Sequence, residues 1–323
     1  PLDDHKTVPY ASTVPGVTHA CGHDAHTTIV MGAGIALDAL RRAAADDPEL
    51  PPVGPVRLIF QPSEEKAPGG ARAIIEAGGL DGVAAILGMH CDPSLPCGQV
   101  GLRVGPVTSA VDLVEIVLRG PGGHTARPHL TVNLLEAAGR VLVDLPERVA
   151  ARLPSVEGHA RLVFGVMSGG HAPNVIPTEA RIVGTFRTME PDVWAQAESV
   201  VQSALTEVLA GYPVEVELRY ERGAPPVVND AEVTATATKA AEAALGAAAV
   251  VEAEPSQGGE DFSFYLDHVP GTYMRLGVAR PAAGPEAPPA PALHTSLFDI
   301  DERAISIGIR TLVYAVLAAQ AAG

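Results

Sequence analysis

The sequence Val56-Arg57-Leu58-Ile59-Phe60-Gln61-Pro62-Ser63-Glu64-Glu65 joins a short, mainly apolar run to a turn that carries two adjacent carboxylates. The run Val56–Phe60 predicts a buried strand. The next segment, residues 70–76, is typical of a helix that ends at Gly78-Gly79, because glycine commonly follows the last turn of a helix. Residues 84–88 predict a second apolar strand. This β-α-β order favours a mainly parallel sheet covered by helices.

The outer parts of the chain continue the alternation of helix and strand. Residues 26–42 are rich in Ala and Leu and predict a helix. Near the end of the chain we expect a helix over 230–245, strands over 248–253 and 273–278, and a closing helix over 302–321. Two proline-rich stretches, 48–55 and 281–291, predict surface loops, because proline fixes φ and lacks an N–H donor.

The middle of the chain has a different order of elements: strand, helix, strand, strand, helix, strand. This is the order of the ferredoxin-like fold. The predicted strands are 112–119, 161–167, 179–189 and 213–220, and the predicted helices are 131–148 and 192–209. We therefore expect an α/β fold, in which a three-layer α/β domain (1–105 and 223–323) is interrupted by a smaller ferredoxin-like α+β domain (106–222).

The composition limits the classes of function. The chain has 323 residues, enough for about two domains, and a formal net charge of −16. Such an acidic chain lacks the basic surface that binds nucleic acids or anionic membranes, so we expect neither as a partner. No stretch reaches about 18 consecutive apolar residues, and residues 1–6 do not resemble a signal peptide. Three cysteines are too few for a disulfide scaffold, which favours a cytoplasmic location.

One cluster of residues suggests a metal site. Three histidines, a cysteine and an aspartate lie within His19-Ala20-Cys21-Gly22-His23-Asp24-Ala25-His26. Thiolate and imidazole are ligands for zinc and similar ions, and Cys21 and His23 could both face one ion from a loop. Two local alternatives stay open. Asp24 could cap the following helix, and His26 could be an ordinary residue of its first turn.

Three other segments place acid–base or ligand side chains after predicted strands. Glu64 and Glu65 follow the first strand, and His90 directly follows the second. His294 follows a later strand and a proline-rich loop. In open α/β sheets, ligands bind beyond the carboxyl ends of strands, and one Glu could bind a metal while its neighbour acts as general base. Singly, each could be a solvated carboxylate or a core histidine; together they predict a site at one sheet edge.

The middle domain offers three further candidates. His124 lies in a glycine-rich turn and Asn174 in a second turn, and each could have only a local structural role. Arg187 interrupts an otherwise apolar strand, where it is either paired structurally or used as a bidentate clamp for a carboxylate. Cys91 and Cys97 have no obvious partner ligands, and we interpret both as structural.

Seven phrases of the sequence together resemble one known family. They are His19–His26, Gln61–Glu65, Gly88–His90, Gly122–His129, Ala172–Pro177, Gly258–Phe262 and Leu293–Asp301. In this order they resemble the aminoacylase and carboxypeptidase-like metallopeptidases. The similarity is greatest to the amidohydrolase branch, which includes hippurate hydrolases, indole-acetyl-amino-acid hydrolases and N-acyl-amino-acid amidohydrolases. Family members begin with a further strand-rich segment, so by this resemblance we expect several strands of the first domain to be missing here.

The resemblance implies that the first domain binds metal and that the inserted domain is a lid and dimerisation domain. It implies two divalent metal ions per chain, zinc, manganese, cobalt or nickel. The matching ligand positions are Cys21, His23, Glu65, His90 and His294. Glu64 matches the general base, and the roles of individual residues in Gly258–Phe262 are not assigned.

The resemblance also implies a substrate and a dimer. His124 would reach the metal site of a neighbouring subunit and polarise the scissile carbonyl, which implies a homodimer through the lid. Asn174 and Arg187 would hold the free carboxylate of a small-molecule N-acyl amino acid. Its amide bond would be hydrolysed to a carboxylic acid and a free amino acid. The alternatives are a dipeptidase or carboxypeptidase of the same family, and a truncated, inactive chain that acts only through dimerisation.

Overall fold

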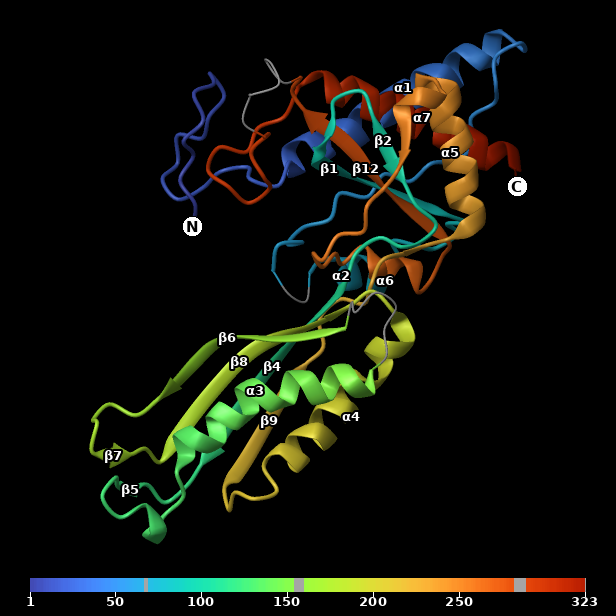
Figure 1. Cartoon of the computed structure of the whole chain (residues 1–323). Helices are drawn as coiled ribbons and strands as arrows, with labels where there is room; N and C mark the ends of the chain where they lie inside the picture. Colours follow the sequence, from blue (N-terminus) through green and yellow to red (C-terminus); the bar gives the residue numbers. More distant parts are fainter. Residues whose placement is uncertain (67–68, 154–159, 282–288, 323) are drawn as a thin grey trace.

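Two four-stranded sheets, each with its own helices, form the main part of the computed structural model of the chain, and β10-β3 and β5-β7 add two short two-stranded sheets (Figure 1). The structure describes residues 1–66, 69–153, 160–281 and 289–322. The described helices are α1 (His23–Asp46), α2 (Ala71–Glu76), α3 (Leu134–Arg152), α4 (Pro191–Val208), α5 (Ala231–Leu245), α6 (Ser263–Leu266) and α7 (Arg303–Ala322), with 3-10 turns η1 (Pro128–Leu130) and η3 (Ala247–Ala249). The described strands are β1 (Ile86–Pro96), β2 (Val100–Leu102), β3 (Gly105–Pro106), β4 (Ala110–Arg119), β5 (Gly123–His124), β6 (Arg161–Gly169), β7 (Val175–Ile176), β8 (Glu179–Thr188), β9 (Glu215–Glu221), β10 (Val228–Asn229), β11 (Val250–Glu252) and β12 (Gly271–Ala279).

The larger domain has the predicted three layers. Its sheet has the order β1-β12-β2-β11, with β1 parallel to β12 and β2 antiparallel to it. Successive residues of a strand face opposite sides of a sheet. Met274 of β12 therefore packs in a cluster with Ile29 of α1, whereas Tyr273 packs with Phe264 of α6. Helices α1, α7 and α5 lie on the first side, and α2 and α6 lie on the second.

The smaller domain has the predicted ferredoxin-like topology. Its antiparallel sheet has the order β6-β8-β4-β9, and α3 and α4 pack together on one face. Strand β4 alternates in burial, so that Ile116 and Leu118 lie in the core beneath the helices. All four strands and both helices fall within the predicted insert, and their bounds lie close to those that the periodicity predicts. The domain boundaries at 106 and 222 stay a prediction.

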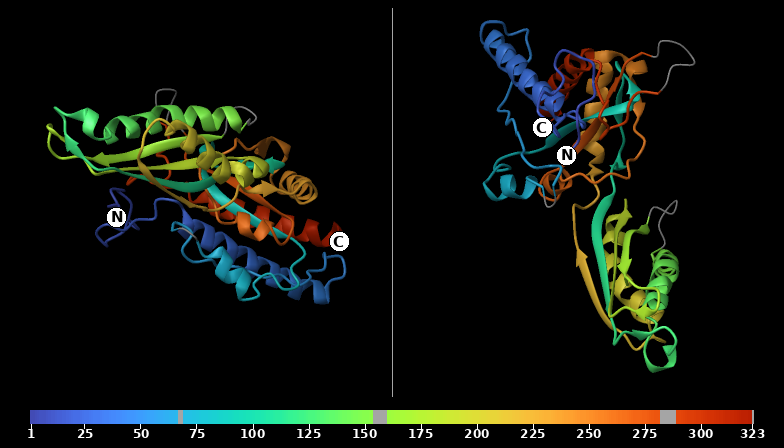
Figure 2. Two further views of the ribbon diagram at one scale, coloured as in Figure 1. Left: turned by 90° about the horizontal axis from the view of Figure 1, so that it is seen from below. Right: turned by 90° about the vertical axis from the view of Figure 1, so that its left-hand side faces the viewer.

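The two domains meet at one end of the smaller domain (Figure 2). There β3 pairs with β10, so the outgoing and returning segments of the chain are bonded to each other. A fully buried carboxylate, Asp112 of β4, holds the returning segment by accepting hydrogen bonds from Trp194 Nε1 (2.9 Å), Tyr220 Oη (2.7 Å) and Gly223 N (3.1 Å). A buried carboxylate that accepts several hydrogen bonds is held firmly in place. Asp112 therefore fixes the position of the returning segment at the domain junction.

One predicted strand is wrong. Residues 56–60 form no strand, and within the described part of the chain no strand pairs with them. Val56, Leu58 and Phe60, which we expected in the core, are 39%, 40% and 51% exposed. Arg57 donates to two carbonyl groups just after α2, so side-chain contacts hold this segment where a backbone ladder was expected. The prediction failed because apolar residues favour a strand only where a neighbouring strand pairs with them.

The predicted closing helix is confirmed as α7. Its length and mean hydropathy of 1.5 would allow it to cross a membrane, by length and composition only. In the structure, one face of α7 belongs to the core of the larger domain. Gly308 lies against Ile29 of α1, and Leu312 is buried in the same cluster.

Candidate metal centre

The first two candidate ligands lie at the start of α1. Cys21 is buried in the loop before the helix, and His23 is the first helical residue. Gly22 between them has φ of +81°, and a Cβ atom there would lie 2.9 Å from Cys91 Sγ. A positive φ of this kind favours glycine. The backbone at Gly22 therefore turns Cys21 and His23 toward one region, as the Cys-Gly-His spacing indicates.

Replacing Gly22 by Ala should disturb this turn. We expect the variant to lose about 1–3 kcal/mol of unfolding free energy, because the methyl group forces a strained φ and contacts a buried sulfur. Metal content should fall with it, measured by elemental analysis alongside thermal unfolding. Gly139→Ala is the matched control, since a Cβ there meets no atom within 4 Å and α3 tolerates alanine. A Gly22→Ala protein with unchanged stability and metal content would contradict this account.

His90 is oriented by its main-chain neighbours. It lies inside β1, and not after the strand as predicted, and it is 8% exposed. Its Nδ1 is 2.7 Å from the carbonyl oxygen of Cys91, so Nδ1–H donates, because a carbonyl only accepts. Its Nε2 is then free of a proton and faces Cys21 Sγ at 3.3 Å. Burial and the nearby positive charge of Arg275 lower the pKa of His90 to about 3, so the imidazole is neutral, as a metal ligand must be.

The carboxylates and the last histidine complete the cluster. His23 Nε2 lies 3.5 Å from Glu64 Oε2 and 3.9 Å from Glu65 Oε1. His294 Nε2 lies 3.4 Å from the same oxygen of Glu65. His294 has φ of +61°, and its N–H donates to the carbonyl of Ala20 at 2.7 Å, which holds it beside the Cys21 loop. Four separate segments thus meet at one place.

This cluster concentrates acidic groups. Burial, and then the nearby carboxylates Glu260, Glu65 and Asp261, raise the pKa of Glu64 to about 8. Burial and the charges of Glu65 and Glu64 likewise raise the pKa of the Cys21 thiol. Among the described residues, neither Glu64 nor Glu65 forms an ion pair with Lys or Arg. These two carboxylates therefore have no Lys or Arg of the described chain in direct contact to stabilise their charged forms.

The donor set fits two cations that share ligands. Three groups have all their ligand atoms within 4.8 Å of one another: Cys21, His23 and His90; Cys21, Glu65 and His294; and His23, Glu64 and Glu65. Thiolate, imidazole and carboxylate together suit zinc and its first-row neighbours. The structure thus brings together all five predicted ligands and Glu64.

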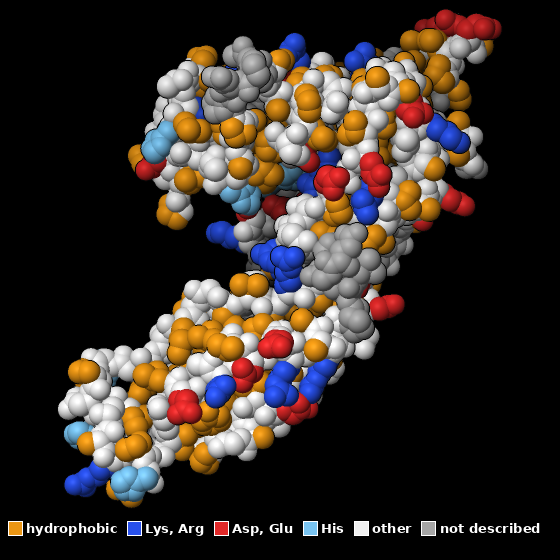
Figure 3. Space-filling model, viewed as in Figure 1, with side chains coloured by type: hydrophobic (Ala, Val, Ile, Leu, Met, Phe, Trp, Pro, Cys, Tyr) orange, Lys and Arg blue, Asp and Glu red, His pale blue; other side chains and the backbone are white. Residues whose placement is uncertain are grey.

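The predicted substrate residues lie elsewhere. His124 belongs to β5, and Asn174 immediately precedes β7; both are exposed at the end of the smaller domain that points away from the larger one (Figure 1). They are neighbours, since Thr125 N donates to the carbonyl of Asn174 at 3.1 Å. Arg187 of β8 instead lies at the domain junction, where it donates to the carbonyl of Gln257. None of the three contacts the six clustered side chains, which are Cys21, His23, Glu64, Glu65, His90 and His294. Figure 3 shows a hollow between the two domains, with histidine side chains near it and others at the far end of the smaller domain.

Two of the local alternatives can be decided. Asp24 does not cap α1: Gly22 occupies the N-cap position, and Asp24 is an exposed residue of the first turn. His26 has a specific contact, because its Nε2 accepts a hydrogen bond from Cys91 N at 2.8 Å. His26 therefore ties the start of α1 to β1, next to His90.

Three residues of this region have roles that the sequence analysis missed. Glu260 accepts hydrogen bonds from Phe262 N (3.1 Å) and from the hydroxyl of Tyr273. Gln61 donates to the carboxylate of Asp261 (2.7 Å). The phrase Gly258–Phe262 was visible in the sequence, but the contact between Gln61 and Asp261, 200 residues apart, leaves no local signal.

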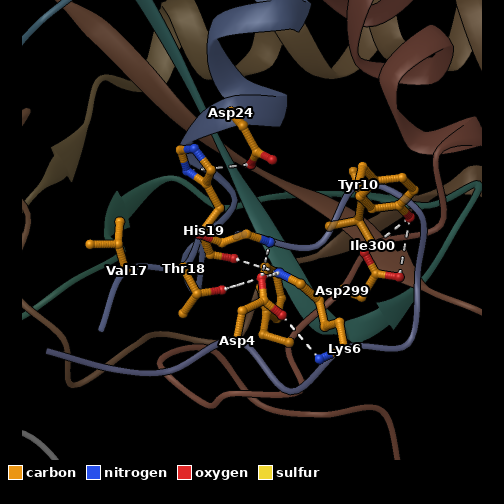
Figure 4. A pocket seen from close by; sticks show the side chains of 11 residues that line it. Asp4, Lys6, Tyr10, Val17, Thr18, His19, Asp24, Asp299 and Ile300 are labelled. Atoms are coloured by element: carbon orange, nitrogen blue, oxygen red, sulfur yellow. Dashed lines mark hydrogen bonds and ion pairs between the residues drawn. The ribbon is translucent and has the colours of Figure 1, made fainter. Parts of the chain in front are cut away.

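A separate cavity of about 240 Å³ lies beside the N-terminal segment (Figure 4). Its polar groups are paired with one another. Asp4 accepts from Thr18 Oγ1 (2.8 Å) and pairs with Lys6 (3.2 Å), and Tyr10 Oη is 3.3 Å from Asp299. None of the candidate metal ligands lines it. The contact between Tyr10 and Asp299 attaches the N-terminal segment to the larger domain, and the contacts of Asp4 hold that segment together.

Comparison with known proteins gives one consistent family. The model of "Peptidase family M20/M25/M40" matches residues 1–318. N-acetylcysteine deacetylase from Bacillus subtilis is 37% identical over 307 residues, which are 95% of this chain and 75% of that protein. The solved structure of the Bacillus subtilis YXEP protein, described as a dinuclear metal binding peptidase, superposes with a TM-score of 0.79 and 31% identity, over 98% of this chain and 77% of that one.

A third relative is much longer than this chain. A Rhodococcus jostii protein that carries the name of a glutamate–cysteine ligase is 43% identical over 97% of this chain. The chain spans only 38% of that protein, against 75% and 77% of the other two.

Proposed function

Because the chain belongs to peptidase family M20/M25/M40, a family of hydrolases that act on amide bonds, we propose that it hydrolyses the amide bond of small N-acyl amino acids. The products would be a carboxylic acid and a free amino acid. The observation that carries the proposal is the meeting of three ligand groups, built from six side chains, at the sheet edge. The N-acetylcysteine deacetylase relative supports an N-acyl substrate.

The cofactor would be two divalent metal ions. Cys21, His23, Glu65, His90 and His294 would hold them. The dinuclear YXEP structure supports this number. Zinc is favoured by the soft thiolate ligand, with manganese, cobalt and nickel as alternatives. When bound, the ions would polarise the amide carbonyl and acidify the attacking water.

Glu64 would be the general base. It lies beside the ligand Glu65, and its Oε2 is within 3.5 Å of the ligand His23. A carboxylate in this position can take the proton of the attacking water and pass it to the departing amine. Of the six clustered side chains, Glu64 is the one that is not assigned as a ligand.

Two copies of the chain would complete the site together, because His124 and Asn174 lie at the free end of the smaller domain and Arg187 lies at the domain junction. A second copy would supply the first two, and Arg187 would come from the same chain. His124 would donate to the developing oxyanion, and Asn174 and Arg187 would hold the carboxylate of the amino acid. The position of His124 and Asn174, at the free end of the smaller domain, supports their use by a partner in a homodimer. The three cysteines are free, which is consistent with the cytoplasm as the proposed location.

The test begins with the metal content of the purified chain after dialysis against zinc or manganese. The loaded protein is then offered N-acetyl-methionine and the matched free-amine dipeptide Ala-Met. About two metals per chain and faster hydrolysis of the acetylated compound would support the proposal. Faster cleavage of the dipeptide would favour a dipeptidase. Two metals without hydrolysis across a panel of acyl groups, or no metal at all, would contradict it and favour a chain that acts only through dimerisation.

A further inference from the structure

We propose that Asp261 is a positioning residue that, through Gln61, sets the place of Glu64 and Glu65. The inference rests on the proposed function, because it concerns the same site. Neither side chain would touch the substrate. Both would act on the loop that carries the general base and a metal ligand.

The contacts of Asp261 clamp both ends of this loop. Gln61 Nε2 donates to the two carboxylate oxygens of Asp261 at 2.7 and 2.8 Å. At the other end, Ala71 N donates to Asp261 Oδ2 at 3.1 Å. Asp261 is only 6% exposed, so its hydrogen bonds are protected from water. One carboxylate thus fixes the residues on either side of Glu64 and Glu65.

The amide of Gln61 can have only one orientation. Its Oε1 accepts a hydrogen bond from Tyr265 Oη at 2.8 Å, so its nitrogen must face Asp261. Reversing the amide would set its oxygen against the two acceptor oxygens of Asp261, so the contact with Asp261 decides the orientation. This network of donors and acceptors therefore specifies the position of Gln61, three residues before Glu64.

The backbone of the loop is fitted to the same carboxylate. Gly69 has φ of +82°, and a Cβ atom there would lie 1.9 Å from Asp261 Oδ2. A Cβ at Gly70 would lie 2.0 Å from the carbonyl oxygen of Pro62. No larger residue fits at either glycine unless the loop moves, so Asp261 is in direct contact with the loop.

Among the described residues, few backbone hydrogen bonds hold this loop in place. Residues 56–60, which precede Gln61, form no strand, so no ladder of backbone hydrogen bonds anchors the loop from that side. Within the described part of the loop, the backbone hydrogen bonds are Lys66 N to Ser63 O (3.3 Å) and Gly69 N to Lys66 O (2.7 Å). The position of Glu64 and Glu65 therefore depends on the contact between Gln61 and Asp261.

The experiment exchanges the two partners. In Gln61→Glu alone, two carboxylates face each other and the loop should be displaced. In Asp261→Asn alone, an amide N–H faces either Gln61 Nε2 or Ala71 N. In the double variant, the new amide at position 261 can donate to the new carboxylate at position 61 and accept from Ala71 N. That carboxylate still accepts from Tyr265, so Ala71 N, Tyr265 Oη and the pair at positions 61 and 261 each regain a hydrogen bond.

We measure three quantities for each variant: the dissociation constant for zinc alone by competition with a chelator, kcat and KM for N-acetyl-methionine, and hydrogen exchange of the 61–71 amides. Gln61→Glu should weaken zinc binding and lower kcat by about 10–100-fold and speed exchange in this loop, and the double variant should recover most of each loss. Asp267→Asn, an exposed aspartate just after α6, is the control and should change nothing.

The outcomes separate this inference from the proposed function. If Gln61→Glu keeps the zinc affinity and exchange of the parent protein, or if the double variant is no better than Gln61→Glu, Asp261 does not position the loop. If Gln61→Glu fails to fold, the same comparison is made between the milder variant Asp261→Asn and the double variant. If the parent protein binds zinc but hydrolyses nothing, zinc affinity and exchange still decide the positioning role, while the proposed activity is contradicted.

Discussion

Replacing Glu64 by Gln should leave the metal content unchanged and slow amide hydrolysis by about 10²–10⁴-fold. Glutamine has nearly the same shape as glutamate and can keep a contact with His23, whose Nε2 lies 3.5 Å from Glu64 Oε2. It cannot take a proton from water, because its amide oxygen is far less basic than a carboxylate. The loss should therefore appear in kcat, with little change in KM or in the melting temperature.

The neighbouring carboxylate provides the matched control. Glu65→Gln should lose metal as well as activity, because Glu65 Oε1 lies within 4 Å of both His23 and His294. Elemental analysis and steady-state kinetics on the two variants distinguish the role of general base, expected for Glu64, from the role of metal ligand, expected for Glu65. If Glu64→Gln keeps its metal and stays within about threefold of the parent rate, Glu64 is not the base. If it loses metal, Glu64 is a ligand.

The fold was largely predictable because its pattern is local. In β4, buried residues alternate with less buried ones from Ala110 to Ile116, and that period of two is readable in the sequence. Asp230 caps α5 by accepting from Glu232 N and Val233 N, so the start of that helix is also a local signal. Residues 56–60 have the composition of a strand but no strand pairs with them, and pairing is not a local property.

The ligand cluster was predictable for a different reason. Cys21, His23 and His90 have few structural uses in such a combination, so the residue types themselves indicate a metal site, although His90 lies inside β1 and not after it as predicted. The clamp on Gln61 was not predictable, because Gln61 and Asp261 are 200 residues apart and both have ordinary surface chemistry. Their importance comes from burial and from mutual hydrogen bonding, which only the fold creates.

Replacing His124 by Ala should slow hydrolysis by about 10²–10³-fold, the usual cost of removing one oxyanion donor. The side chain is exposed on β5, so folding and metal content should not change. His129→Ala is the matched control, since His129 is an exposed histidine in the turn that follows. If the turnover of His124→Ala is close to that of His129→Ala, His124 takes no part in the reaction.

A mixing experiment then shows which subunit supplies His124. His124→Ala and Glu64→Gln chains are each nearly inactive, so any activity in a 1:1 mixture must come from mixed dimers. If the base acts in its own chain and His124 acts in the partner, each mixed dimer has one complete site and one without either group. Random pairing makes half of the dimers mixed, so about a quarter of the parent activity should return. If both groups act within one chain, no pairing restores a site and the mixture stays inactive. Strand β5, which carries His124, lies at the free end of the smaller domain and away from α1 of its own chain, and this favours the first result.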